Sequence, residues 1–451
     1  MLKGQKEIIA AQATPPGNAG VGIVRISGIN LIDIAKQLLH KLPAPRVAEY
    51  LPFFDEENDV IDIGLALYFP APNSFTGEDV LELHGHGGQV ILDILLKRVV
   101  ACGARLAEPG EFSYRAFMNN KIDLAQAEAI SDLISASTEQ AARSAIRSLK
   151  GDFSEKIHLL LKQLVNTRMY VESAIDFPEE EIDFLADGEL DNLMNSLIKN
   201  LSEVLSVAKQ GCVLNEGMSV VIAGQPNAGK SSLLNKLAGY DAAIVTDIEG
   251  TTRDVLKESI NIEGMPLHII DTAGLRDDAD TVEKEGIKRA WKEIEGADHI
   301  ILVVDHSKGK TEKDEEILQR LPENLAVTIV FNKIDVKNCK PELVARESYS
   351  EVYLSVKQNK GLDLLSAHLK QIMGYQPNSD GLFIARHRHL NALTRAYEFV
   401  QTGYQQLQHH MAGELLAEDL RQAQLALNEI TGEFDNEDLL GEIFSSFCIG
   451  K

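Results

Sequence analysis

The sequence predicts a multidomain protein with an N-terminal α+β domain, a central all-α helical domain, and an α/β domain inserted into the helical one. Three observations predict this fold class. The chain has 451 residues, which is more than a single hydrophobic core usually serves. Short β-rich runs dominate its first quarter. Long stretches with apolar residues three and four positions apart lie on both sides of a part in which strands and helices alternate.

The N-terminal domain is expected to span residues 1–118. Its β-rich runs, such as residues 21–26 and 80–83, alternate with Pro and Gly turns, and one helical stretch lies near residues 89–100. This mixture is typical of a small α+β domain.

Helical periodicity occupies residues 119–216 and returns in residues 377–451. The two parts can bury their apolar stripes against each other, so we expect one helical domain in two pieces. Between them, residues 217–376 alternate helices with the β-branched runs SVVIAG, LHIIDTAG, IILVVD, VTIVFNKID and EVYLSV. That alternation predicts a parallel α/β sheet.

Composition limits the classes of function. The apolar fraction of 44% and the charged fraction of 25% are those of an ordinary globular protein, and the net charge of -24 confines any RNA contact to a local basic patch. The four cysteines are scattered without metal-binding or disulfide spacing. The apolar stretch at the start of the chain is too short for a signal peptide, and no apolar stretch of about 18 residues follows. We therefore expect a cytoplasmic protein that does not cross a membrane.

A phosphate-binding loop is predicted at residues 224–231, where GQPNAGKS matches GxxxxGKS between an apolar strand and a helical stretch. Backbone amides of such a loop curl around phosphate groups, Lys230 would reach the β- and γ-phosphates, and Ser231 would ligate Mg²⁺. The nucleotide-binding residues expected here are Asn227, Ala228, Gly229, Lys230, Ser231 and Ser232.

Three further motifs follow in the order that a GTPase requires. The run Asp271, Thr272, Ala273 and Gly274 follows a strand and suits the magnesium shell and the γ-phosphate. The run Asn332, Lys333, Ile334 and Asp335 follows another strand, and the carboxylate of Asp335 can accept hydrogen bonds from guanine N1–H and the exocyclic amine. Such paired bonds can reject the wrong base by roughly 10⁴ to 10⁵. Ser355, Val356 and Lys357 would cover the base.

A threonine loop lies between the first two motifs and is expected to close over the γ-phosphate and the metal. Its candidate residues are Thr246, Asp247, Ile248, Glu249, Gly250, Thr251 and Thr252. From the residues alone, either Thr251 or Thr252 could be the magnesium ligand. Leu275 stands where Ras-like GTPases keep a water-positioning glutamine, so the groups that orient water must come from elsewhere. Arg276, Glu283 and Glu285 are the candidates, and Glu285 fits a solvated helix face better. The inserted domain is therefore predicted to be a Ras-like α/β P-loop GTPase.

Together with the flanking stretches ATPPGNAGVGIVRISG, PNSFTGEDVLELHGHGG, PGEFSYRAF, KIDLAQAEAI and FSSFCIGK, these motifs resemble the MnmE (TrmE) family of tRNA-modification GTPases over the whole chain. The resemblance implies a homodimer whose residues 1–118 bind folate and dimerise. It also implies a partner, an MnmG-like flavoprotein that carries FAD. The pair would add an aminomethyl or carboxymethylaminomethyl group to C5 of the wobble uridine, position 34, of certain tRNAs, with 5-formyl- or methylene-tetrahydrofolate as one-carbon donor.

The resemblance also implies roles for individual residues. K⁺ would replace an arginine finger and activate hydrolysis when two nucleotide-binding domains face each other. Its ligands would be Asn227, Thr246, Ile248 and Thr251. Thr252 would join Ser231 on Mg²⁺, and Glu283 would orient the attacking water. Folate would contact Arg25, Glu82, Lys121 and Lys451.

Two interpretations stay open at this point. Cys448, in the C-terminal CIGK tail, is either a residue of the modification chemistry or a buried, inert thiol. The alternative function is a regulatory or ribosome-assembly GTPase switch without modification chemistry, which would be expected to add a basic RNA-binding module.

His84 and His86, with no further ligand clustered near them, make a poor metal site.

Overall fold

The protein is seen here as a computed structural model, which divides into two compact units. The described residues are 7–176, 188–238, 257–262, 265–271, 297–322, 325–373, 383–410, 413–433, 437–445, 447 and 450. One unit comprises residues 1–131, 148–190 and 399–451, and the other comprises residues 132–147 and 191–398.

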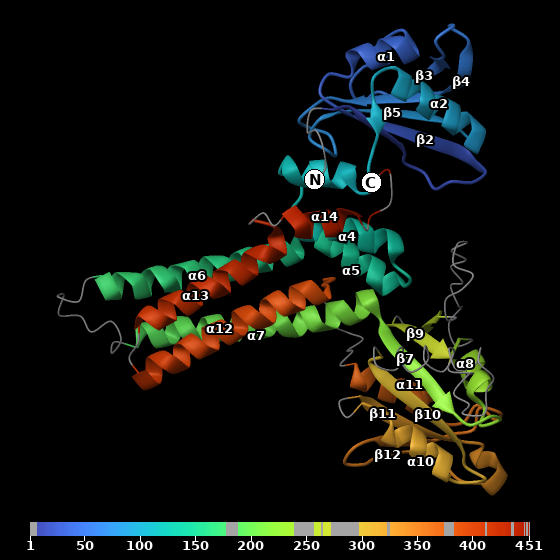
Figure 1. Cartoon of the computed structure of the whole chain (residues 1–451), viewed down its shortest axis with the longest axis vertical. Helices are drawn as coiled ribbons and strands as arrows, with labels where there is room; N and C mark the ends of the chain where they lie inside the picture. Colours follow the sequence, from blue (N-terminus) through green and yellow to red (C-terminus); the bar gives the residue numbers. More distant parts are fainter. Residues whose placement is uncertain are drawn as a thin grey trace. The chain divides into compact units, whose positions relative to one another are not determined.

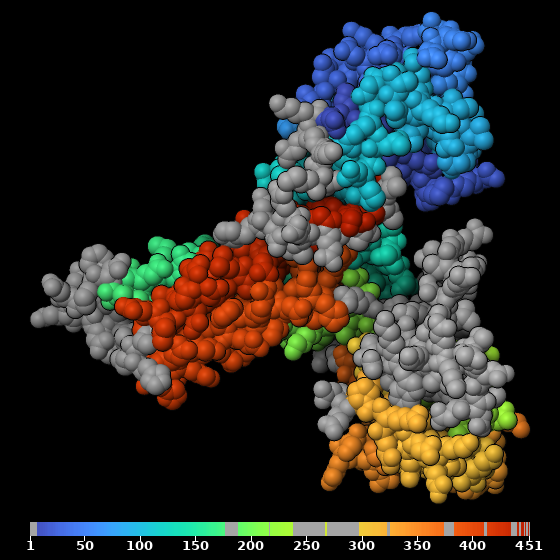
Figure 2. All heavy atoms as spheres, viewed as in Figure 1, coloured from blue at the N-terminus to red at the C-terminus, as the bar shows by residue number. Residues whose placement is uncertain are grey.

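The first unit contains a six-stranded sheet in the order β3-β4-β5-β2-β1-β6 (Figure 1). Its elements are β1 (Ile9–Gln12), β2 (Ala19–Gly28), α1 (Ile32–Leu39), β3 (Glu49–Phe54), β4 (Val60–Phe69), β5 (Asp79–Gly87), α2 (Gln89–Ala101) and β6 (Arg105–Leu106). The pairs are antiparallel except that of β1 with β6. In the space-filling view this blue and cyan domain is one closely packed body (Figure 2).

Strand alternation decides which side chains of this sheet enter its core. Val24 and Ile26 of β2 and Leu81 and Leu83 of β5 are fully buried. The residues between them, Arg25 and Glu82, face each other across the β2–β5 pair on the opposite side of the sheet. A charged pair is thus built into the middle of the sheet.

Helices complete the first unit: α3 (Glu111–Met118), α4 (Leu124–Ser135), α6 (Asp152–Asp176), α13 (Gly413–Thr431) and α14 (Glu437–Ser445). The long helices α6 and α13 lie side by side (Figure 1). Leu124 and Ala127 of α4 form an apolar cluster with Ile443 and Phe444 of α14. Segments from both halves of the sequence therefore share one core, as the sequence predicted for the helical domain.

The second unit is built on a seven-stranded sheet in the order β12-β13-β11-β10-β7-β9-β8. Its strands are β7 (Met218–Gly224), β8 (Lys257–Ile262), β9 (Met265–Asp271), β10 (His299–Asp305), β11 (Ala326–Asn332), β12 (Glu342–Ala345) and β13 (Ser350–Tyr353). Its helices include α8 (Lys230–Ala238), α10 (Glu312–Gln319), the 3-10 turn η1 (Ile334–Lys337) and α11 (Leu362–Ile372). The five strands β9, β7, β10, β11 and β13 are parallel, and apolar clusters cover both faces of the sheet.

Parts of three further helices belong to the same unit. The helices are α5 (Glu139–Lys150), α7 (Glu189–Glu216), which leads into β7, and α12 (His387–His410), which follows the domain. A side chain at Gly211 of α7 would come within 2.0 Å of the carbonyl oxygen of Phe383, so the chain returns from the domain directly against α7. Arg386 then donates to Asp132 at 2.6 Å. The predicted multidomain class, with a P-loop domain inserted between helical parts, is confirmed.

None of the helices in the described part of the chain is both long and apolar enough to cross a membrane.

Three buried polar side chains in the nucleotide-binding domain connect β10, β11 and α11 by hydrogen bonds. Thr328 Oγ1 lies 2.8 Å from His299 Nε2 and 3.0 Å from His368 Nε2, and all three residues are buried. Burial, followed by the neighbouring His368, lowers the pKa of His299 to about 4. The folded domain thus favours the neutral imidazole.

Acid is expected to destabilise this domain through His299. The unfolded chain binds a proton near pH 6.5 and the folded domain only near pH 4, so stability is full above pH 6.5 and is lost as the pH falls towards 4. The expected loss between pH 7 and pH 5 is about 2 kcal/mol. Denaturant unfolding at both pH values measures it. His299→Leu should show a smaller difference between the two pH values than wild type, and an unchanged difference would contradict the assignment.

Candidate functional site

The loop between β7 and α8 has the backbone of a phosphate cradle. Gly224, Asn227 and Gly229 all have positive φ, at 139°, 63° and 103°. A side chain at Gly224 would lie 2.2 Å from the carbonyl oxygen of Val303, and one at Gly229 would lie 2.2 Å from Asn332 Nδ2. Only glycine fits at these two positions. A loop with such a backbone can present N–H groups to an anion that accepts from them.

Lys230 and Ser231 begin α8 immediately after this loop. Lys230 Nζ donates to the carbonyl oxygens of Gly224 at 2.7 Å and Gln225 at 3.1 Å, which holds the ammonium group over the loop. Ser231 is exposed in the first helical turn. Asp271, the last residue of β9, pairs in register with Ile222 of β7. Backbone amides, an ammonium group, and a hydroxyl at a helix N-terminus fit a magnesium-bound polyphosphate.

Asn332 connects the phosphate loop to the loops on the base side. It ends β11 and is almost fully buried. Its Nδ2 donates to the Ala228 carbonyl oxygen at 3.0 Å, and its Oδ1 accepts from the backbone N–H groups of Lys333 at 2.8 Å and Val356 at 3.2 Å. All three hydrogen bonds of this amide group go to protein atoms, so the group fixes three loops relative to one another.

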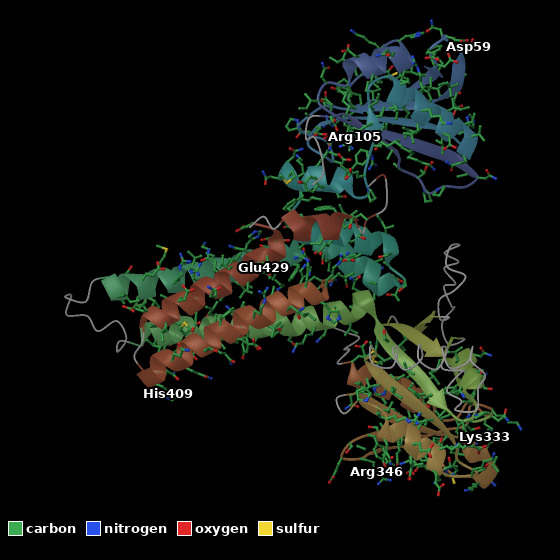
Figure 3. All side chains as sticks on the ribbon, viewed as in Figure 1. Asp59, Arg105, Lys333, Arg346, His409 and Glu429 are labelled. Carbon is green, nitrogen blue, oxygen red and sulfur yellow. The ribbon has the colours of Figure 1, made fainter. Side chains whose placement is uncertain are left out.

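Lys333, labelled in Figure 3, also links the phosphate loop to the end of a neighbouring strand. Its Nζ donates to the Asn227 carbonyl oxygen at 2.6 Å and to Asp305 Oδ2 at 2.7 Å. Burial alone would raise the pKa of Asp305, but hydrogen bonds from Lys333 and Ser307 outweigh it and lower the pKa to about 2. Asp305 is thus a carboxylate at any pH at which the protein works, and it holds Lys333 in place.

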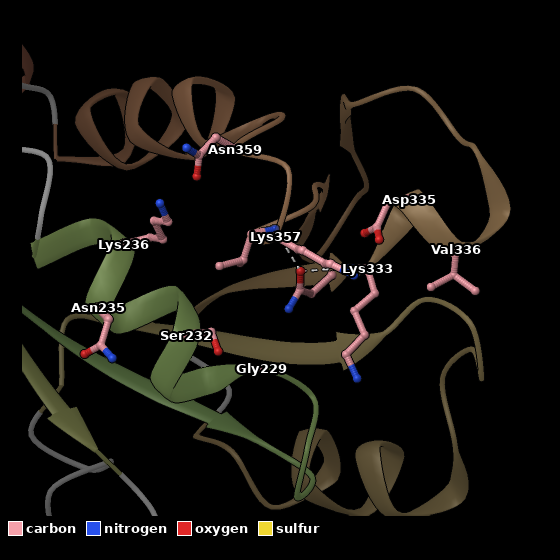
Figure 4. Close-up of a pocket in the computed structure, with 11 residues that line it drawn as sticks. Gly229, Ser232, Asn235, Lys236, Lys333, Asp335, Val336, Lys357 and Asn359 are labelled. Carbon is pink, nitrogen blue, oxygen red and sulfur yellow. Dashed lines mark hydrogen bonds between the residues drawn. The ribbon is translucent and has the colours of Figure 1, made fainter.

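The carboxylate of Asp335 lies at a cavity between the loops. Ser355, which is fully buried, donates to Asp335 Oδ1 at 2.5 Å. This bond orients the carboxylate, which lines a cavity of about 960 Å³ together with Gly229, Ser232, Val356 and Lys357 (Figure 4). The phosphate loop, the strand-end loop after β11 and the loop after β13 thus open onto one cavity.

Four further residues line this cavity and were not predicted from the motifs: Asn235, Lys236, Val336 and Asn359 (Figure 4). A signal for two of them existed. Asn235 and Lys236 lie three and four positions after Ser232, which places them on the same face of a helix. Val336 directly follows Asp335. Asn359 follows Lys357 by two positions in a loop, where spacing alone does not fix the direction of a side chain.

Several predicted site residues lie outside the described residues. They are Thr246, Asp247, Ile248, Glu249, Gly250, Thr251, Thr252, Thr272, Ala273, Gly274, Glu283, Cys448 and Lys451. Asp271 is described only as the end of β9, and its side chain is not.

A second candidate site lies on the face of the N-terminal sheet opposite to its buried Val24 and Leu83. Arg25 Nε donates to Glu82 Oε1 at 2.8 Å, and His84 Nε2 lies 3.0 Å from Glu82 Oε2. Burial by itself would raise the pKa of Glu82, but Arg25 and His84 outweigh it and lower the pKa. Glu82 is therefore an ionised acceptor that is mostly shielded from water, with 15% of its side chain exposed.

Other segments of the first unit meet Arg25. Its guanidinium lies 6.0 Å from the ring centre of Phe75 and 5.8 Å from that of Phe112. Its NH1 donates to the carbonyl oxygen of Gly450 at 3.4 Å. Gly450 has φ 95°, and a side chain there would lie 2.3 Å from the Gln12 carbonyl oxygen. The residue before Lys451 is thus held beside Arg25.

Lys121, at the start of the helical part, lies against the loop before β5. A side chain built at Gly77, in the loop before β5, would lie 3.3 Å from Lys121 Cδ. Charged and aromatic groups from distant parts of the sequence thus gather around Arg25 and Glu82, and this set fits a ligand with a polar heteroaromatic ring and carboxylates. His86, by contrast, pairs with Asp62 at 2.7 Å. Among the described residues, no group of three or more His, Cys, Asp or Glu could hold a metal ion.

Comparison with known proteins covers both the N-terminal part and the rest of the chain. A family model described as "GTP-binding protein TrmE N-terminus" matches residues 8–121, and one described as "MnmE helical domain" matches residues 124–448. The tRNA modification GTPase MnmE of Hydrogenovibrio crunogenus is 59% identical over 445 residues, which cover 99% of each chain. The protein of that name from Proteus mirabilis is 59% identical over 450 residues, again 99% of each chain.

Solved structures give weaker matches. A GDP-bound Era of Aquifex aeolicus is 28% identical over 40% of this chain and 66% of that chain, with a TM-score of 0.28, which carries no weight for the fold. The two family models together match most of the chain, and the full-length relatives cover 99% of it. This chain therefore belongs to the MnmE (TrmE) family of tRNA modification GTPases.

Proposed function

We propose that the protein hydrolyses GTP in a potassium-dependent cycle in which the nucleotide-binding domains of a homodimer pair. We also propose that, with an MnmG-like flavoprotein that carries FAD, it adds an aminomethyl or carboxymethylaminomethyl group to C5 of uridine 34 of certain tRNAs. A tetrahydrofolate, in the 5-formyl or methylene form, is the proposed one-carbon donor. The observation that carries the GTPase part is the meeting of the loops after β7, β11 and β13 at one cavity.

The chain's own groups account for nucleotide binding. The backbone N–H groups of Asn227, Ala228 and Gly229 would donate to the phosphate oxygens, and the ammonium group of Lys230 would leave its two carbonyl partners for them. Asp335 would accept from guanine N1–H and the exocyclic amine while Ser355 holds its other oxygen. Ser231, and Thr252 in the proposed set, would hold Mg²⁺, which supplies charge neutralisation on the phosphate oxygens.

The proposed potassium site explains hydrolysis without the glutamine of Ras-like proteins. Asn227 is on the exposed tip of the phosphate loop, where a second domain could approach it. Its proposed co-ligands Thr246, Ile248 and Thr251, and Glu283 as the group that orients water, lie outside the described residues. A bound monovalent cation supplies the positive charge that an arginine finger supplies elsewhere.

Folate is proposed to bind around Arg25, Glu82, Lys121 and Lys451. The lowered pKa of Glu82 suits it to accept from the paired N–H donors of a pterin, and the basic residues suit a glutamate tail. Cys448, two residues before the anchored Gly450, is proposed for the modification chemistry, against the alternative of an inert thiol.

A GTPase switch without modification chemistry is the alternative function. It is disfavoured because the family relatives match the N-terminal and helical parts as well as the nucleotide-binding domain. The domain boundaries at residues 118, 216 and 376, and a cytoplasmic location, remain part of the proposal.

Replacing Asp335 is expected to change which base the nucleotide site prefers. In Asp335→Asn the amide nitrogen faces the exocyclic amine of guanine, donor against donor, so GTP affinity should fall roughly 100-fold or more. Xanthosine triphosphate, which has a carbonyl oxygen there, should bind the variant better than GTP does. Titration with both nucleotides measures this. Asp363→Asn, an exposed substitution in α11 of the same domain, is the matched control and should bind GTP normally. Retention of GTP preference by Asp335→Asn would contradict the assignment.

Potassium is expected to accelerate GTP turnover over sodium at equal ionic strength by roughly tenfold or more, because a positive charge near the phosphates stabilises the transition state. Asn227→Ala should lose this difference. Since Asn227 has a φ of 63°, Asn227→Gly is the better-matched variant, which keeps the backbone and removes only the side chain. Both variants should still bind GTP. Equal wild-type rates in the two salts would remove the potassium mechanism and leave a GTPase.

A further inference from the structure

The loop of residues 73–78, before β5, forms one side of the proposed folate site. Phe75 lies on this loop, is 38% exposed, and has its ring 6.0 Å from the guanidinium of Arg25. Two positions later, the backbone of Gly77, with φ 78°, runs against the stem of Lys121. One short loop therefore touches two of the four proposed folate residues.

A network of buried charged side chains is bonded to the last residue of this loop. Glu78, its last residue, accepts from Arg115 NH1 at 2.9 and 3.2 Å with its two carboxylate oxygens. Arg115 NH2 donates to Glu111 at 2.9 Å, and Glu111 accepts from Arg105 at 2.6 Å. Arg115 and Glu111 are 4% and 3% exposed, so the alternating charges compensate one another away from water.

Hydroxyl and amide groups of neighbouring elements also form hydrogen bonds to this loop. Ser27 Oγ of β2 donates to Glu78 Oε2 at 2.8 Å and lies 2.7 Å from Thr76 Oγ1, and both hydroxyls are fully buried. Asn119 Nδ2 donates to the Thr76 carbonyl oxygen at 2.7 Å. Thr76 and Glu78, which follow Phe75 and Gly77 in this loop, are thus fixed, while Phe75 itself stays 38% exposed.

We propose that the buried Glu78–Arg115 ion pair is a positioning device, which fixes the loop so that Phe75 forms an aromatic wall for the reduced folate beside Arg25. The inference rests on the proposed folate function. A reduced folate carries a pterin and an aminobenzoyl ring, and a half-exposed ring next to a guanidinium offers a face for one of them. Glu78 and Arg115 act through Phe75 and do not touch the ligand.

The test is a binding titration of the full-length chain with 5-formyltetrahydrofolate as the probe. Phe75→Ala and Glu78→Gln should each raise the Kd roughly tenfold, because the ring is removed in one and displaced in the other. The double variant should be no weaker than either single variant, since both act through the same ring. GTP affinity should not change in any of them. Ser27→Ala, a milder change that removes hydrogen bonds to Glu78 and Thr76, should raise the Kd less and serves if Glu78→Gln does not fold.

Arg105→Lys is the matched control, because it disturbs the far end of the charge network and does not touch the loop. It should lower thermal stability and leave the Kd for the probe unchanged. If Glu78→Gln binds like wild type, or if its effect adds fully to that of Phe75→Ala, the positioning role is overturned while the folate site stands. If the wild-type chain does not bind the probe, the folate function itself falls, and this inference falls with it.

Discussion

The side-chain amide of Asn332 is the contact on which the nucleotide site depends. Its donor group holds the phosphate loop at Ala228 and its acceptor oxygen holds the base-side loop at Val356. These loops follow different strands, and their separation is set by the parallel sheet, in which Val303 of β10 pairs with Gly224 and Asp305 pairs with Asn332. Strand register brings the loop ends to one edge, and the buried amide then fixes them there.

The two candidate sites are built in opposite ways. The nucleotide site relies on backbone groups and on glycines that permit close approach, as at Gly229, where Asn332 leaves no room for a side chain. The N-terminal site relies on compensated charges at the centre of a sheet, where Arg25 and Glu82 face each other in register. A backbone cradle suits a triphosphate that must be bound and released, whereas a fixed ion pair suits a ligand that is held by its ring edges and carboxylates.

Much of the nucleotide site could be predicted because its signals are local. The run from Gly224 to Ser231 contains its own turn residues and lies between a strand and a helix, so the sequence specifies both the loop and its context. The role of Asn332 as a brace between loops could not be predicted, because it depends on atoms about 100 positions away in the chain. The same holds for Arg25 and Glu82. By residue type alone they would be solvent-facing strand positions, and only strand register and the C-terminal Gly450 place them in a shielded site.

The close approach of Gly211 to Phe383 brings the entry and the exit of the nucleotide-binding domain to one place on α7. The chain enters the domain at the end of α7 and leaves it beside a point only a few residues earlier on the same helix. Leu214, three positions further along α7, is fully buried in the apolar core of the nucleotide-binding domain, so the end of this helix and the domain form one packed body. A side chain at position 211 would push the returning chain away from that body.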